Sequence, residues 1–198
     1  MHHILTLLSC LTLLTGCSAS KVVQSWADPN LPKPKKLMVF GVTSEEGVRR
    51  EYEDLLSQAL SARGLDAIPS YNVLQVKGEV DKEKVIAAVH KAGVDGVFIT
   101  RLVTVTTRVD AVPQSGPVQT YPFSAASSYW PTYYVESYRL VEHDLAYIES
   151  NVYATPSSAL LMSIMTQTID PNYSDRQIRD LVAVIVKELG KKRFLSEP

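Results

Sequence analysis

The succession of patterns between residues 37 and 109 constrains the fold more than any other feature of the sequence. Short apolar runs typical of buried strands lie at 37–42, 65–70 and 94–109, and the last continues as an alternation of Thr and Val. The segments between them, 43–64 and 81–93, carry apolar residues at helical spacing. Because a β-α-β-α-β order favours parallel strands joined by right-handed crossovers, we expect an α/β fold.

Local residue types mark where the two helices begin and end. Thr43 and Glu46 fit a capping box, and Gly64 closes the first helix. Asp81 suits the start of the second helix, which ends at Gly93.

The second half of the chain has a different order. Two strands are expected at about 135–153 and 160–168, joined as an antiparallel hairpin through 155–158. A last helix opens at Ser174, with Gln177 at capping-box spacing and Gly190 as its stop. Residues 37–198 are therefore predicted to form a single α/β domain, with three helices on a mixed sheet of about five strands in the order β-α-β-α-β-β-β-α.

The amino terminus carries the most specific motif. The apolar run 4–14 is shorter than the roughly 18 to 20 residues that span a bilayer, and it resembles the core of a secretory signal. Leu14, Thr15 and Gly16 precede Cys17 and match the bacterial lipobox. By this resemblance residues 1–16 are a signal peptide, and Cys17 becomes the lipidated first residue of a membrane-anchored protein. The alternatives are an ordinary signal peptide that contains a cysteine, or a buried apolar helix.

Lipidation would account for all the cysteine chemistry of the mature chain. The other cysteine, Cys10, lies inside the predicted signal peptide, so no intramolecular disulfide can form after cleavage. The signal departs from the usual pattern because Met1, His2 and His3 supply no Lys or Arg. Ser18 after the cysteine resembles the outer-membrane sorting pattern, which implies the periplasmic side of the outer membrane if the source is Gram-negative.

Two segments have compositions typical of irregular structure. Residues 17–36 contain Pro29, Pro32 and Pro34 among lysines, which predicts an extended tether. Residues 111–134 form a predicted loop rich in proline and aromatic residues, which could contact a protein or a sugar ring, or fold back over the sheet. The candidate contact residues are Tyr121, Phe123, Tyr129, Trp130, Tyr133 and Tyr134.

No pattern of catalytic, metal-binding or cofactor-binding residues stands out. The formal net charge of −1 gives no reason to expect nucleic acid as a partner. Neither His90 nor His143 has a second ligand at metal-binding spacing, and no phosphate loop or nucleophile elbow occurs. Glu51, Glu53 and Asp54 could pair as carboxylates, but on an exposed helical face they are expected to be solvated, with Arg49 and Glu53 as an i,i+4 pair. We therefore expect a non-enzymatic protein without a cofactor.

Several short motifs carry a family resemblance. They are 25–29 (Ser-Trp-Ala-Asp-Pro), 38–42 (Met-Val-Phe-Gly-Val) with Arg49, Arg50 and Glu53, 69–71 (Pro-Ser-Tyr) and 95–97 (Asp-Gly-Val). With the lipobox they resemble a group of uncharacterised bacterial envelope lipoproteins. The architecture is also similar to the periplasmic α/β domain of the curli-secretion lipoprotein, the penicillin-binding-protein activator lipoproteins and the Tol-system propeller protein. The curli-secretion family adds membrane-spanning hairpins, whose alternating apolar pattern 111–134 lacks.

These features favour a membrane-anchored, non-catalytic module that binds another envelope protein or acts as a scaffold. Two alternatives remain open at the level of sequence. The aromatic loop could bind a glycan or a small apolar ligand, or the protein could be a subunit of an oligomeric export or assembly complex.

Overall fold

The computed structural model describes residues 19–74, 82–114 and 137–195, and within them it confirms the α/β class. The sheet has six strands rather than the expected five or so: β1 (Ser20–Ala27), β2 (Lys36–Val42), β3 (Asp66–Pro69), β4 (Gly96–Gln114), β5 (Ser137–Ala154) and β6 (Leu160–Ile169). The helices are α1 (Glu46–Ser61), α2 (Lys82–Ala92) and α3 (Asp175–Lys191), with a 3-10 turn η1 at Ser70–Asn72. The three helices and the mixed sheet are as predicted.

The sheet combines a parallel half with an antiparallel half, in the spatial order β1-β6-β5-β4-β2-β3. β2 pairs in parallel with both β3 and β4, as the β-α-β-α-β pattern required. β4, β5, β6 and β1 are antiparallel neighbours. The hairpin predicted from β5 to β6 is present.

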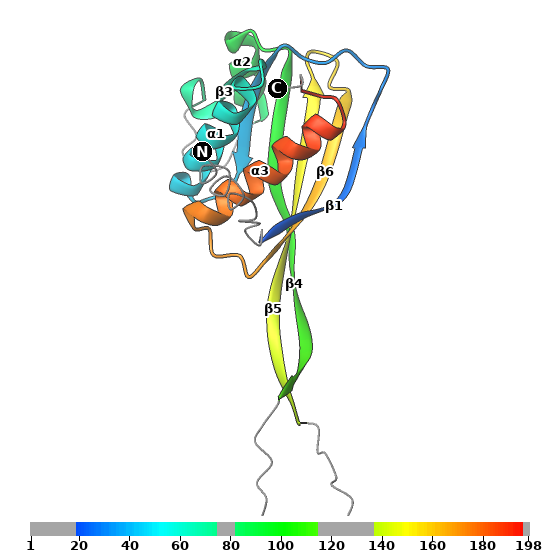
Figure 1. Cartoon of the computed structure of the whole chain (residues 1–198). Coiled ribbons are helices and arrows are strands. Elements are labelled where there is room, and N and C mark those ends of the chain that lie inside the picture. The colour runs from blue at the N-terminus through cyan, green and yellow to red at the C-terminus, as the bar shows by residue number, and fades with distance from the viewer. Residues whose placement is uncertain (1–18, 75–81, 115–136, 196–198) are drawn as a thin grey trace, which may run out of the picture.

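The helices divide between the two faces of the sheet (Figure 1). α1 and α3 cover one face, where Phe98, Leu56 and Ile185 belong to the largest buried cluster and are fully buried. On the other face a smaller cluster joins Met38 of β2 to Val89 of α2. β2, which lies between β4 and β3, is therefore buried on both faces, and this explains its unbroken apolar run.

β4 and β5 are much longer than their neighbours and leave the globular domain as a two-stranded ribbon (Figure 1). β2 follows β4 only as far as Arg101, and β6 follows β5 only from Leu145 onward. Beyond those points residues 104–114 pair with residues 137–147 in continuous antiparallel register. We call the part formed by 104–114 and 137–144 the ribbon.

The predicted tether is wrong for residues 20–27, because they form the edge strand β1 against β6. Val22 and Ala27 pack against the main core, and this burial outweighs the composition of the segment around them. The domain therefore begins ahead of residue 37. The predicted loop is also shorter at its start, because β4 continues to Gln114.

The predicted helix ends are partly confirmed. Gly64 and Gly93 follow α1 and α2 with φ of +80° and +59°, the left-handed conformation that glycine tolerates best. The capping box at α1 is wrong, because Glu45 occupies the N-cap position without a side-chain hydrogen bond. Gly190 lies inside α3 rather than after it, and Arg193 takes the left-handed conformation instead.

Candidate functional site

The residues predicted to carry function lie outside the described part of the chain. This holds for Cys17 and for its lipobox of Leu14, Thr15 and Gly16. It also holds for the aromatic residues Tyr121, Phe123, Tyr129, Trp130, Tyr133 and Tyr134. Lipidation and an aromatic contact loop therefore stay predictions. The surface that the structure does describe next to the predicted loop is the ribbon.

One side of the ribbon carries most of its exposed apolar side chains, with Thr107, Glu142 and Asp144 between them. Residues two apart on a strand share a side, as do directly opposed residues of paired strands. The register opposes Ala111 to Leu140 and Pro113 to Tyr138, and alternation adds Val105 and Val109. The exposed fractions of Val109, Tyr138 and Leu140 are 53%, 53% and 69%. We call Val105, Val109, Ala111, Tyr138 and Leu140 the apolar side.

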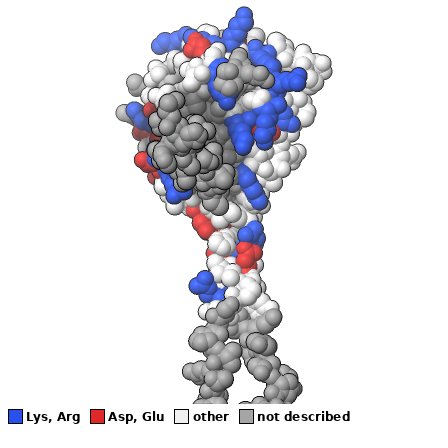
Figure 2. All heavy atoms as spheres, viewed as in Figure 1, with Lys and Arg blue, Asp and Glu red and all other residues white. Residues whose placement is uncertain are grey.

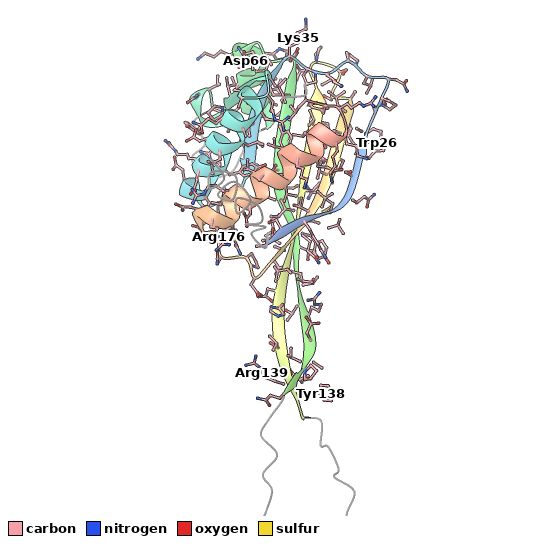
Figure 3. All side chains as sticks on the ribbon, in the orientation of Figure 1. Trp26, Lys35, Asp66, Tyr138, Arg139 and Arg176 are labelled. Atoms are coloured by element: carbon pink, nitrogen blue, oxygen red, sulfur yellow. The ribbon has the colours of Figure 1, made fainter. Side chains whose placement is uncertain are left out.

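The opposite side of the ribbon is more polar, although Val112 and Val141 also lie on it. Arg108 forms an ion pair with Asp110, with Nη2 and Oδ2 2.6 Å apart. His143 Nδ1 lies 2.8 Å from Oδ2 of Asp170, which follows β6. That hydrogen bond holds the pKa of Asp170 below its usual range and ties the ribbon to the globular domain. Tyr138 and Arg139, at the far end, point to opposite sides (Figure 3).

Both long edges of the ribbon lack a partner strand among the described residues. An unpaired edge presents backbone N–H and C=O groups to which another strand can add. An isolated pair of strands is also only marginally stable in water. The ribbon contributes no residue to the three buried clusters of the domain. Its edges and its apolar side together form a surface suited to contact with another polypeptide.

Sequence reasoning placed Glu53 wrongly. The structure buries it completely and makes it an acceptor for Gly41 N at 3.0 Å, Ser70 Oγ at 2.8 Å and Tyr71 N at 3.3 Å. Burial raises the pKa of Glu53 above its usual range, although the hydrogen bonds oppose this. The expected i,i+4 ion pair with Arg49 does not form within 4 Å, while Arg50 pairs with Glu46 at 2.7 Å.

The helical period of α1 could have predicted that Glu53 is buried. Arg49, Glu53, Leu56 and Leu60 recur at intervals of three and four residues, and all four are buried. The carboxylate fixes the end of β2 and the turn η1 to α1, which is a structural role.

The residue types that bind metal ions do not cluster in the described part of the chain. No group of three His, Cys, Asp or Glu side chains in 19–74, 82–114 and 137–195 could hold a metal ion. Next to Glu53, Tyr52 Oη lies 2.6 Å from Thr100 Oγ1, which lies 2.9 Å from Ser150 Oγ. Burial raises the pKa of Tyr52 far above its usual value, so this hydroxyl is a neutral hydrogen-bonding group in the core.

Lys and Arg side chains gather on one part of the globular surface, over the carboxyl-terminal end of α3 (Figure 2). Lys187, Lys191, Lys192 and Arg193 are exposed there. Cations at this end interact favourably with the helix dipole, which explains them without a ligand.

Comparison with known proteins gives weak similarities. No protein-family model matches the chain, and no curated protein matches it. Among solved structures, the PelC dodecamer from Paraburkholderia phytofirmans is similar with 11% identity and a TM-score of 0.48, over 90% of this chain and 99% of that chain. A neuraminyllactose-binding hemagglutinin homolog from Helicobacter pylori is similar with 14% identity and a TM-score of 0.35, over 82% and 87%. In the described ranges, none of the helices is both long and apolar enough to cross a membrane.

Proposed function

We propose that this protein is a membrane-anchored envelope lipoprotein that acts as a non-catalytic protein-binding module, with the ribbon as its contact surface. The observation that carries the proposal is a ribbon with two unpaired edges and an apolar side that projects from the folded domain (Figure 1). The lipobox before Cys17 supports an anchored position, on the periplasmic side of the outer membrane if the source is Gram-negative.

The preferred partner is a protein that offers a β-strand with apolar side chains. Adding a strand satisfies the backbone groups of one ribbon edge. Burying a Val or Leu side chain completely contributes about 1.5–3 kcal/mol, and the half-exposed side chains of Val109 and Leu140 retain a large share of that gain. Less of this gain is available on the opposite side, where Val112 is exposed but Arg108 and Asp110 already pair.

Site-specific photo-crosslinking in cells tests the proposal. A photoreactive phenylalanine analogue replaces Leu140 on the apolar side, and a matched probe replaces Gln58 on the exposed surface of α1. We expect a discrete crosslinked envelope protein from position 140 and none from position 58. Equal crosslinking patterns at the two positions would contradict a contact through the ribbon.

A variant without the outer part of the ribbon, called the ribbon-less variant, provides the second arm. Joining Thr107 to Asp144 through Asn-Gly removes 108–143 and keeps the 2.9 Å hydrogen bond between Thr107 Oγ1 and Asp144 Oδ1. Asn-Gly is the preferred two-residue link between antiparallel strands. This ribbon-less variant should fold and reach the membrane but lose the crosslinked partner from affinity capture. Recovery of the same partner would show that the contact lies elsewhere.

A subunit role in an oligomeric export or assembly complex is the second candidate, and the two unpaired edges favour it. The free edge of β4 in one copy can pair with the antiparallel free edge of β5 in the next, and such head-to-tail contacts close into rings. Native mass spectrometry of the lipidated protein in detergent should then show a defined oligomer, which Leu140→Lys disrupts. A monomer at high concentration would exclude this function.

A further inference from the structure

A cavity of about 360 Å³ lies where α1 begins, beside the carboxyl end of β2 and the first turns of α3. β2 continues through α1 to β3 on one side, while β4 lies on its other side. Open α/β sheets bind ligands at this kind of position, outside the carboxyl ends of strands where the chain direction reverses. The cavity is separate from the ribbon surface.

The walls of the cavity are mainly apolar. Aliphatic side chains from α1, β4, β5 and α3 contribute to them, among them Val48, Leu102, Ala146, Ile148, Ile178 and Leu181. Ligand pockets of this size combine such walls with a few polar groups that fix orientation. An apolar molecular body fits this environment better than a fully polar one.

Three charged residues line the cavity: Glu45, Arg49 and Arg101. Arg101 already pairs with Glu149, with Nη2 and Oε2 2.7 Å apart, so Arg49 is the cation there that has no ion pair among the described residues. Its side chain lines the cavity and is only 5% exposed, and Nη1 has no hydrogen-bond partner in the described structure. A buried guanidinium nitrogen without an acceptor is costly, because it has lost water without replacement. Glu53 does not supply that acceptor, because its carboxylate accepts from Gly41, Ser70 and Tyr71 and lies beyond ion-pair distance of Arg49.

The start of α1 adds a second source of positive potential at the same place. Its N-cap residue Glu45 gives no side-chain hydrogen bond to the first turn, and both Ser44 and Glu45 line the cavity. Backbone N–H groups at a helix start favour an anion. The charge of neighbouring Glu46 is offset by its ion pair with Arg50.

We propose that this cavity binds a small organic carboxylate with an apolar body. The carboxylate would accept hydrogen bonds from Arg49 and from the start of α1, while the body packs against Val48 and Ile178. A single negative charge suits the site better than a dianion, because Glu45 lies at the cavity. Inorganic phosphate also lacks a body for the apolar walls.

Octanoate is the probe that tests the proposal, with octan-1-ol and inorganic phosphate as comparators. In ¹H–¹⁵N NMR titrations of the full-length mature chain, octanoate should saturate and shift the backbone amides of Gly47 and Val48. Octan-1-ol and phosphate should each bind at least about tenfold more weakly, because each lacks either the charge or the body. Equal binding of octan-1-ol and octanoate would contradict the proposal that Arg49 and the start of α1 recognise a carboxylate.

Two variants and a control locate the site. Arg49→Met should weaken octanoate binding about tenfold or more. Because Arg49 is buried and its loss can unfold the chain, Ser44→Glu is the second variant. It adds a carboxylate at the exposed start of α1, which the helix dipole tolerates, and should weaken octanoate binding similarly. Gln24→Glu, the same change of charge on exposed β1, should bind octanoate like the wild type. Unchanged binding in folded Ser44→Glu, or equal loss in Gln24→Glu, would refute the site.

Discussion

Replacing Glu53 with Gln tests whether a buried carboxylate holds the junction of β2, α1 and η1 together. Gln has the same shape, and its amide oxygen can still accept from Gly41 N and Ser70 Oγ, which lie 3.0 and 2.8 Å from the Glu53 carboxylate. The NH₂ group of Gln would replace the second carboxylate oxygen of Glu53, which accepts a hydrogen bond from Tyr71 N at 3.3 Å. An NH₂ group cannot accept that hydrogen bond. Hydrogen bonds to a charged group contribute about 1.5–3 kcal/mol each, whereas ionising a buried group has an opposing cost.

The balance between these effects depends on pH, and the raised pKa of Glu53 sets its sign. The ordinary value is 4.5 and burial raises it in the folded state, so the unfolded chain releases the proton first. Between the two pKa values the folded state binds more protons, and its stability therefore falls as pH rises. For one proton the slope is at most about 1.4 kcal/mol per pH unit. Glu53→Gln has no such proton to release.

Urea unfolding followed by circular dichroism, between pH 4 and pH 8, measures this dependence. The free energy of unfolding of the wild type minus that of Glu53→Gln should decrease with pH above the ordinary glutamate range and then become constant. Half-exposed Glu51 in the same helix gives a matched control, and Glu51→Gln should change stability by no more than about 0.5 kcal/mol. A difference that increases with pH would show that the hydrogen bonds outweigh burial and that the sign is wrong.

Three further predictions concern packing and are measured by chemical denaturation. Ile185→Ala removes a side chain that is 0% exposed and should lower the free energy of unfolding by about 2–5 kcal/mol, whereas Val109→Ala on the ribbon should change it by less than about 0.5 kcal/mol. Gly96→Ala should lower the free energy of unfolding by about 1–3 kcal/mol, because the added Cβ would lie 2.7 Å from Leu37 Cδ2. Gly190→Ala should instead stabilise α3 by about 0.5–1 kcal/mol, because a Cβ added there would have nothing within 4 Å. The ribbon-less variant should keep the unfolding free energy of the full chain within about 1 kcal/mol, since the ribbon adds no residue to the buried clusters, and a larger loss would mean that the ribbon supports the core.

The parallel half of the fold could be predicted because its signals are local. β2 is apolar on both faces, and α1 and α2 each carry a helical stripe that ends at a left-handed glycine. β1 was not predicted because, among the described residues, it pairs only with β6, which lies far along the chain, as in the pairing of Ser20 with Thr168. The prolines that follow β1 suggested a tether, and composition alone cannot separate an edge strand from an extended linker.

Charged residues on the buried face of α1 show a different limit. Arg49 and Glu53 share a stripe with Leu56 and Leu60, although charged side chains on a helix are usually expected to be exposed to solvent. The expectation fails here because Gly41 and Ser70, on other elements, supply hydrogen bonds that make burial of the Glu53 carboxylate possible. Only the tertiary structure brings those donors together. The same burial leaves Arg49 Nη1 without an acceptor, which is the reason for proposing a ligand beside it.

The ribbon follows from a mismatch of strand lengths. β4 and β5 contain 19 and 18 residues, while their outer neighbours β2 and β6 contain 7 and 10. Because strands rise about 3.3 Å per residue, the surplus has to extend beyond the sheet with unpaired edges. Natural proteins usually shorten or cover such edges, since they promote association. A long ribbon with Val109 and Leu140 exposed on one side is therefore the reason for proposing a protein contact there, with a different protein or with another copy of this chain.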